Sequence, residues 1–503
     1  MRKLFLVFLP AFLFFSKQKI EYDTIIRHAQ VCDGSGGRPF SADIGIIADT
    51  IAFIGDLEHA SAKNEIDAHS LILAPGFIDT HSHHAGELFQ HRDVLAAVSQ
   101  GLTTIIIGQD GESRFPLATF FQQLLDTPVA INIGSYCGHN TIRDSVLGKD
   151  FKRLASKEEI EKMKLLLRQD METGAFGLST GLEYDPGIYS SPDEVLQLAK
   201  EVAPYRGRYI SHIRSEDRYF WKAIDEIINI GKATKIPVQI SHIKLAMHNL
   251  WEKSDSLLLL LDNARKSGIN ITSDIYPYAF WHSTIRVLFP DRNFSDEKEA
   301  EMILKEITLP QDIILSSYEI QPEYEGKSLA TIAALENKAP ARMLTELIAR
   351  IEKFERENKR ACDEGILATS MDENDIKKLM NWTQANICSD GSSFGGHPRG
   401  YGAFTKVLGH YAREERIFTI QEAIHKMTGL SAEHMGIKRR GLIKKGYYAD
   451  LVLFDPAKVS DRATVAEPHK ISEGIEVVWV NGKQVFKNGK TTGAFPGTII
   501  RRQ

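Results

Sequence analysis

The sequence lacks two features that would each have indicated a particular class of protein. Its 503 residues include only 4 cysteines, too few for a disulfide framework in a chain of this length. Its formal net charge is -5, so it lacks the basic excess of nucleic-acid-binding proteins, and we expect no nucleic-acid partner. The 43% apolar and 25% charged content is that of an ordinary soluble globular protein, long enough for a large core and more than one domain.

The longest uncharged apolar run lies at the N-terminus. Arg2 and Lys3 precede Leu4–Phe15, which has the length of a signal peptide's hydrophobic region and is too short for an ordinary membrane span. The residues after it are poor in the small side chains of a cleavage site, so segment 1–16 is predicted to be a signal peptide or an uncleaved N-terminal anchor. A buried N-terminal helix is the alternative. We expect an exported protein, periplasmic or secreted, that meets a membrane only through this segment.

Short strand-like runs occur near both ends of the chain. They are bounded by Gly, Asp, Asn and Ser turns, and one pair is joined by the hairpin signal Asn481-Gly482. We expect segments 20–74 and 431–503 to pair into one small β-sandwich domain. The runs are Thr24–Ile26, Asp43–Ile47, Ile51–Gly55, Ala449–Phe454, Val477–Val480 and Gln484–Phe486.

Segment 75–430 alternates strand-like and helical runs, which is typical of βα units. Clear helical spacing covers Lys157–Thr173 and Trp221–Thr234. Eight such units predict a TIM (β/α)8 barrel, and the excess length at about 291–360 predicts an insertion between its seventh and eighth strands. The predicted strands end near His83, Gly108, Gly134, Ser179, His212, His242, Asp274 and Asp390.

The first predicted strand ends in a histidine pair. Alternate side chains on a strand share a face, so His81 and His83 lie on one side, about 7 Å apart. Two imidazoles held in this way can bind one divalent metal. A strand that leaves the core through a polar loop would give the same local pattern.

Other predicted strands also end in residues that bind metals or transfer protons. Each has a simpler explanation alone, such as a buried histidine or an Asp-Gly turn. Together they would meet on the C-terminal rim of a barrel, where active sites form. Imidazoles and carboxylates suit zinc-like ions, which polarise carbonyls and lower the pKa of water. The candidate ligands are His81, His83, Asp110, His212, His242 and Asp390.

Asp390 stands apart because it follows the last predicted strand. A carboxylate there can take a proton from water and deliver it to a leaving nitrogen, so Asp390 is the predicted catalytic residue.

With this rim the chain resembles the amidohydrolase superfamily, and closer motifs narrow the resemblance to the N-acyl-D-amino-acid deacylase (D-aminoacylase) family. The similarity runs from about Tyr22 to Arg502. The motifs that carry it are Gly177–Tyr184, Ser211–Glu216, Ser241–Lys244, Ser273–Tyr278, Ser389–Gly391, His397–Gly402 and the closing segment Gly441–Asp455.

The resemblance implies metal-dependent hydrolysis of the amide bond of a small N-acyl-D-amino acid, with one or two zinc ions as cofactor. It assigns His81 and His83 to one metal position and His212 and His242 to the other. Asp390 would act as base and then as acid. Lys244, Tyr276 and Arg399 match the positions that hold the substrate's α-carboxylate, a role that suits an ammonium, a phenol and a forked guanidinium.

The chain departs from the family at one position. Asp110 stands where the commoner family motif has a cysteine that bridges the metals, and a carboxylate is a harder ligand. No lysine occurs between Arg168 and Lys200, which argues against a carbamylated lysine from the fourth strand and leaves Glu183 as a reserve ligand.

Substrate choice within this chemistry has several alternatives. Arg286, shortly after the seventh predicted strand, would either meet an acidic side chain such as that of D-glutamate or D-aspartate, or face solvent. The same site would also suit D-dipeptides, cyclic amides or esters. A non-catalytic binding protein on this scaffold is a further alternative, against which the complete set of ligands argues.

Overall fold

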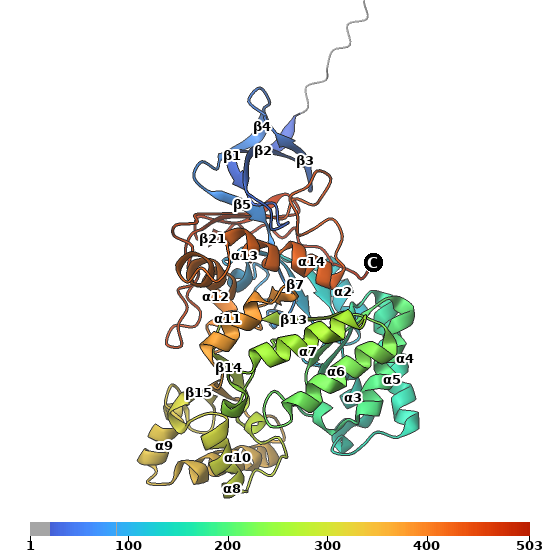
Figure 1. Ribbon diagram of the computed structural model, residues 1–503, viewed down its shortest axis with the longest axis vertical. Coiled ribbons are helices and arrows are strands. Elements are labelled where there is room, and N and C mark those ends of the chain that lie inside the picture. Colours follow the sequence, from blue (N-terminus) through green and yellow to red (C-terminus); the bar gives the residue numbers. More distant parts are fainter. Residues whose placement is uncertain (1–20, 87) are drawn as a thin grey trace, which may run out of the picture.

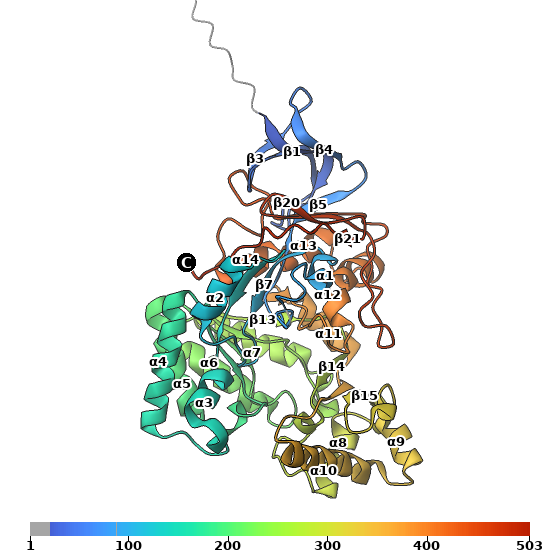
Figure 2. The same ribbon diagram turned by 180° about the vertical axis from the view of Figure 1, so that it is seen from behind.

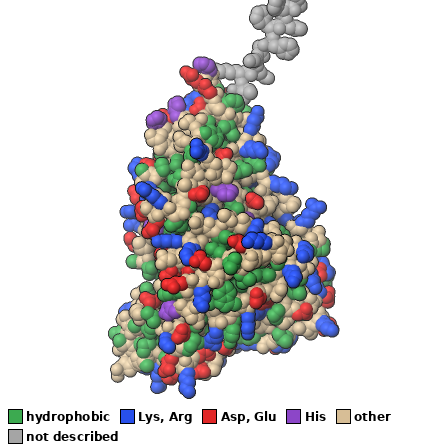
Figure 3. Space-filling view, viewed as in Figure 1, with side chains coloured by type: hydrophobic (Ala, Val, Ile, Leu, Met, Phe, Trp, Pro, Cys, Tyr) green, Lys and Arg blue, Asp and Glu red, His purple; other side chains and the backbone are tan. Residues whose placement is uncertain are grey.

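The structure is a computed structural model that describes residues 21–86 and 88–503. The predicted signal peptide or anchor at 1–16 lies outside the described residues. Within the described ranges, no helix is both long enough and apolar enough to cross a membrane. On the face shown in Figure 3, acidic and basic side chains are interspersed.

The centre of the described chain is built from parallel strands at eight positions. They form two hydrogen-bonded sheets, with orders β6-β7-β8 and β17-β13-β12-β11-β10-β9. The third position is split into β8 and β9, which follow each other directly. The strands are β6 (Phe77–Asp79), β7 (Leu102–Ile107), β8 (Asn132–Ser135), β9 (Cys137–Gly138), β10 (Gly177–Gly181), β11 (Arg208–His212), β12 (Val238–Ile240), β13 (Ile271–Ile275) and β17 (Ala385–Ile387).

Helices cover the outside of these strands (Figure 1 and Figure 2). The strands are almost wholly buried, as parallel strands between helices must be. The predicted helix Lys157–Thr173 is α4, which starts at a capping box between Ser156 and Glu159. The helices are α1 (Leu95–Val98), α2 (Leu117–Asp126), α3 (His139–Leu147), α4 (Lys157–Thr173), α5 (Pro192–Val202), α6 (Phe220–Thr234), α7 (Ser254–Lys266), α11 (Glu373–Asn381), α12 (Arg399–Lys406), α13 (Ile420–Met427) and α14 (Gly429–Met435).

A separate unit lies between β13 and β17, at the opposite end of the molecule from the N-terminal strands (Figure 1). It contains an antiparallel sheet of order β14-β16-β15 and three helices. It is longer than the predicted 291–360 because β14, which precedes that range, pairs with β16, which follows it. Its elements are β14 (Phe280–Ser283), α8 (Glu297–Glu306), β15 (Ile313–Tyr318), α9 (Leu329–Leu335), α10 (Pro340–Asn358) and β16 (Glu364–Thr369).

Strands from the two ends of the chain share one nine-stranded sheet. The antiparallel pairing of β5 with β18 joins the N-terminal strands to the C-terminal ones. The strands are β1 (Tyr22–Val31), β2 (Phe40–Ile47), β3 (Thr50–Gly55), β4 (Ala62–Asp67), β5 (Ile72–Pro75), β18 (Leu451–Phe454), β19 (Ile475–Val480), β20 (Lys483–Lys487) and β21 (Lys490–Thr491).

A buried polar network ties this sheet to the central strands. The Asp450 carboxylate accepts hydrogen bonds from Asn132 Nδ2 on β8 (3.1 Å) and from the Asn481 backbone nitrogen (2.8 Å), and it pairs with Arg440. Asn481 Nδ2 in turn donates to Asn132 Oδ1 at 2.8 Å. Because the Arg440 and Asp450 side chains are only 4% and 3% exposed, each charge depends on the other for compensation.

We expect Asp450→Ala to lower the free energy of unfolding by about 3–5 kcal/mol, because it leaves a buried guanidinium unpaired. Urea denaturation would measure the change. The control is Glu467→Ala, which removes an exposed partner of Lys470 and should cost less than about 1 kcal/mol. Equal losses in the two variants would show that the network does not stabilise the fold.

Candidate metal centre

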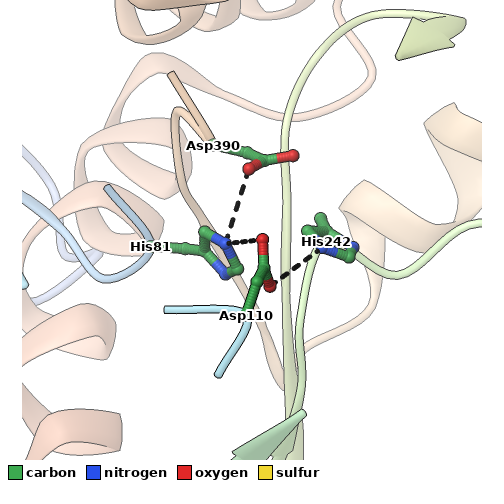
Figure 4. A group of neighbouring side chains, drawn as sticks. All are labelled: His81, Asp110, His242 and Asp390. Carbon is green, nitrogen blue, oxygen red and sulfur yellow. Dashed lines mark hydrogen bonds and ion pairs between the residues drawn. The ribbon is translucent and has the colours of Figure 1, made fainter. Parts of the chain in front are cut away.

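Side chains from four different strand ends meet at one point (Figure 4). His81 follows β6, Asp110 follows β7, His242 follows β12 and Asp390 follows β17. One potential ligand atom from each lies within 4.8 Å of the others, and all four residues are buried. The convergence predicted for the rim is therefore present, although these residues are separated by up to three hundred positions in the sequence.

The contacts divide into two groups of ligand atoms that share the Asp110 carboxylate. In the first group, Nε2 of His81 lies 3.3 Å from Asp110 Oδ2 and 3.4 Å from Asp390 Oδ1. Nε2 of His83 lies 3.2 Å from each of the same two oxygens. In the second, His242 Nε2 lies 3.1 Å from His212 Nδ1 and 3.4 Å from Asp110 Oδ1.

These spacings fit metal coordination. Ligand atoms placed at about 2.0–2.1 Å from one tetrahedral zinc ion are about 3.3 Å apart. Asp110 Oδ1 is buried and, among the described residues, has no hydrogen-bond partner. The donor set of imidazoles and carboxylates is also one that zinc accepts. The residues present therefore suit one cation in each group of ligand atoms, with Asp110 between the two groups.

The electrostatics of the cluster favour positive charge at its centre. Burial disfavours ionisation of His83, yet hydrogen bonds to Asp110 and Asp390 raise its pKa to about 10. Burial likewise opposes ionisation of the two carboxyls, but the pKa of Asp110 is held well below its usual value by His81 and His242. For Asp390 the chief opposing charges are Arg399 and His242, which also hold its pKa well below the usual range. A divalent cation would supply the same positive charge.

Strand ends alone do not aim these side chains. Asp110, His242 and Asp390 have φ angles of 53°, 34° and 48°, in the left-handed region that non-glycine residues rarely adopt. Such conformations persist only where the surroundings enforce them. One enforcing contact is close backbone approach, since a Cβ on Gly181 would lie 2.0 Å from the Asp110 carbonyl oxygen.

Glu183, the predicted reserve ligand, lies behind a histidine in this structure. Its Oε2 is 2.9 Å from His212 Nε2, the ring nitrogen opposite the one that faces His242. Its Oε1 accepts a hydrogen bond from the Glu216 backbone nitrogen at 2.7 Å. This arrangement places a proton on Nε2 of His212 and leaves the Nδ1 lone pair for a metal.

Glu216 was missed as a site residue, although it stands in the motif Ser211–Glu216 four residues after His212. Its carboxylate lies 2.7 and 2.8 Å from Lys244 Nζ, and 3.0 Å from His242 Nδ1. With His212 and His242 it forms a second metal-competent group among the described residues. Because it contacts the Nδ1 side of His242, it can orient that ring with Nε2 towards Asp110.

A cavity of about 370 Å³ opens onto the cluster and is also lined by Lys244, Tyr276 and Arg399. Tyr276 Oη is buried without a hydrogen-bond partner among the described residues. The Arg399 guanidinium lies 4.8 Å from the Tyr276 ring centre, and its NH1 is 2.6 Å from Asp390 Oδ2. Lys244 is bonded to Glu216 and Arg399 to Asp390, so the Tyr276 hydroxyl is the unpartnered donor of the three.

Arg286 does not line this cavity. Its two terminal nitrogens donate to the Glu355 carboxylate at 2.9 and 3.0 Å. The guanidinium is thus engaged with Glu355 outside the cavity lining, and the expectation that Arg286 meets an acidic substrate side chain stays a prediction.

Imidazoles and carboxylates gathered at the carboxyl ends of parallel strands, beside a cavity lined by Lys244, Tyr276 and Arg399, define a metal-dependent hydrolase. The model of the amidohydrolase family matches residues 64–308 and 374–486. D-aminoacylase of Alcaligenes xylosoxydans xylosoxydans is 32% identical over 96% of this chain and 98% of its own length. N-acyl-D-glutamate deacylase of the same organism is 34% identical over 95% and 96%.

A solved structure is also similar. The N-acyl-D-glutamate deacylase of Bordetella bronchiseptica, complexed with zinc and a phosphonate mimic of the tetrahedral intermediate, matches with a TM-score of 0.85. It is 31% identical, and the match covers 96% of this chain and 100% of that one. The chain belongs to the amidohydrolase family and, within it, to the N-acyl-D-amino-acid deacylases, which confirms the resemblance seen in its motifs.

We expect Glu183→Gln to weaken metal binding about 10- to 100-fold, because the amide no longer fixes the tautomer and orientation of His212. Competition with a chromophoric chelator would measure the affinity independently of turnover. Glu201→Gln makes the same chemical change in a surface pair with Arg168 and should leave metal affinity unchanged. If both variants bind metal like the wild type, Glu183 does not position the ligand.

Proposed function

We propose that this protein hydrolyses the amide bond of N-acyl-D-amino acids and releases a carboxylate and a free D-amino acid. The observation that carries the proposal is the Asp110 carboxylate shared by two imidazole pairs, beside an unpartnered Tyr276 hydroxyl and the Arg399 guanidinium. The names of its close relatives, a D-aminoacylase and an N-acyl-D-glutamate deacylase, support the D configuration of the substrate.

The cofactor in this proposal is zinc, with one or two ions bound. His81 and His83 would hold the first position and His212 and His242 the second, with the Asp110 carboxylate available to both. When bound, the cation lowers the pKa of a water molecule and polarises the scissile carbonyl. The zinc in the related deacylase structure supports this choice of metal.

Asp390 moves the proton. Its Oδ1 faces His81 and His83, and its Oδ2 lies 2.6 Å from Arg399 NH1. Arg399 helps to keep the carboxyl ionised against burial, so Asp390 can accept a proton from the attacking water. The same carboxyl then gives that proton to the leaving nitrogen, which completes amide cleavage.

The substrate's α-carboxylate is held by Tyr276 and Arg399, with Lys244 adding positive charge. Lys244 Nζ and the Arg399 guanidinium lie 5.7 and 4.8 Å from the centre of the Tyr276 ring. A hydroxyl and a guanidinium on neighbouring walls can bind the two oxygens of one carboxylate. The hydrogen bond that the Tyr276 hydroxyl lacks would thereby be supplied by substrate.

The domain division follows the sequence pattern. We assign 75–430 to a closed (β/α)8 barrel, and 20–74 with 431–503 to a small β-sandwich domain. Backbone hydrogen bonds from Asp390 to His81 and from His83 to Gly391 support closure, because they link the ends of the first and last strands. Export through segment 1–16, to the periplasm or medium, remains part of the proposal on the basis of sequence alone.

We expect Asp390→Asn to retain metal while its kcat falls by about 10²–10⁴-fold, because an amide cannot shuttle the proton. Metal analysis of the purified variant and kcat on an N-acetyl-D-amino acid would test this. Asp217→Asn is the matched control, since Asp217 lines the same cavity but is bonded to Ser215 and the Arg218 backbone. Turnover that survives in the Asp390 variant would remove this residue from proton transfer.

The proposed binding of the substrate's α-carboxylate by Tyr276 and Arg399 predicts a difference between two variants. Tyr276→Phe should lower kcat/KM by about 10- to 100-fold for an N-acetyl-D-amino acid and much less for its C-terminal amide, because only the first presents a charged acceptor. Arg399→Ala should lower both, since it also removes the partner of Asp390. Steady-state kinetics on the paired substrates would measure this. Equal losses for both substrates in Tyr276→Phe would contradict the binding of the α-carboxylate by Tyr276.

A further inference from the structure

The cavity wall formed by the unit between β13 and β17 contains a buried carboxylate without a full set of partners. Glu364 on β16 lines the cavity together with Trp281, His282 and Ser283 of the paired strand β14. Its side chain is only 2% exposed. Its Oε2 accepts a hydrogen bond from the Ile285 backbone nitrogen at 2.8 Å, whereas Oε1 has no hydrogen-bond partner among the described residues.

The nearest cation does not neutralise this group. Arg286 Nε lies 3.7 Å from Glu364 Oε1, too far for a hydrogen bond, while its two terminal nitrogens bind Glu355. One guanidinium therefore serves two carboxylates, and it is hydrogen-bonded to Glu355 alone. Burial raises the pKa of Glu364 to about 7, so its ionised form lacks adequate compensation.

The other acidic groups that line the cavity differ from Glu364. Glu183 bonds to His212, and Glu216 is doubly bonded to Lys244. Glu112 also lines the cavity, but it is exposed to solvent. Asp217, which also lines the cavity, is bonded to Ser215 and to the Arg218 backbone nitrogen. Outside the cluster around Asp110, Glu364 is thus the cavity carboxylate with a buried, unpartnered oxygen that a ligand would complete.

The wall that holds Glu364 starts beside Arg399, one of the residues proposed to bind the substrate's α-carboxylate. His397 Nδ1 accepts a hydrogen bond from the Arg399 backbone nitrogen at 3.0 Å, which leaves its Nε2 to donate to the Phe280 carbonyl, also at 3.0 Å. The His397 ring stacks on the Phe280 ring at 4.4 Å. Phe280 begins β14, so the insertion sheet adjoins Arg399. A substrate side chain leaves the same carbon as the carboxylate that Arg399 is proposed to bind, so it starts beside this wall.

We propose that Glu364 selects substrates with a basic side chain, namely N-acyl-D-lysine, N-acyl-D-ornithine or N-acyl-D-arginine. The terminal ammonium or guanidinium donates to Glu364 Oε1 and completes the charge balance of the Arg286, Glu355 and Glu364 group. This inference rests on the proposed deacylase function and adds to it the class of side chain. It reverses the expectation from Arg286 alone, because Arg286 stands behind the carboxylate that meets the substrate.

The test begins with the wild-type holoenzyme, so it does not depend on a variant that folds. We expect kcat/KM for N-acetyl-D-lysine to exceed that for N-acetyl-D-norleucine, which lacks only the ammonium, by about 10- to 100-fold. N-acetyl-D-glutamate should be poorer than either. A further arm uses 6-aminohexanoyl-D-norleucine, which carries the ammonium on the acyl group and should gain nothing.

Two matched variants then locate the effect. Glu364→Gln should remove most of the lysine preference, chiefly through KM, while kcat/KM for N-acetyl-D-norleucine changes less than threefold. Glu112→Gln removes a carboxylate from the same cavity at an exposed position and should retain the preference. Inhibition by the products D-lysine and D-norleucine, measured on one common substrate, gives a second comparison of the two side chains that does not depend on their own hydrolysis.

The outcomes separate this inference from the proposed function. Hydrolysis of N-acetyl-D-amino acids with no preference for a basic side chain, or with preference for an acidic one, overturns the role of Glu364 and leaves the deacylase function intact. A gain confined to 6-aminohexanoyl-D-norleucine overturns it as well. Failure to hydrolyse any N-acyl-D-amino acid in the zinc-loaded enzyme overturns the proposed function itself.

Discussion

The rest of the site depends on the Asp110 carboxylate, which lies between two pairs of imidazoles. Its Oδ2 faces His81 and His83, and its Oδ1 faces His242. A buried carboxylate in contact with several imidazoles is stable only with positive charge around it, as the direction of the pKa shifts indicates. The strand ends, the turns after them and the outer carboxylates are arranged so that this charge can be provided.

Holding that arrangement requires backbone that the surrounding fold enforces. Left-handed φ angles at Asp110, His242 and Asp390 turn the chain just after three strands. Behind them, Asp79 accepts hydrogen bonds from the backbone nitrogen and hydroxyl of Ser389, which precedes Asp390. Such supports fix the direction of the reacting side chains before substrate arrives, which is the usual requirement for electrostatic catalysis.

In the proposed function, reaction and selection are carried by different parts of the molecule. The metal ligands and Asp390 come from the ends of the parallel strands, whereas Glu364, Trp281 and His282 come from the unit between β13 and β17. The contact between His397 and Phe280 joins the two parts. Under this proposal, a change in the inserted unit can alter the preferred side chain without moving the metal centre.

The sequence alone determined the family, the alternation of strands and helices, and which side chains end the strands. These follow from periodicity and from local motifs such as His81-x-His83. Tertiary structure decided what those residues face. It put Glu183 behind His212, revealed Glu216 beside His242, and turned Arg286 towards Glu355 rather than the cavity. Periodicity gives a residue's position along its element, but ion pairs and cavity walls depend on contacts between segments far apart in the chain.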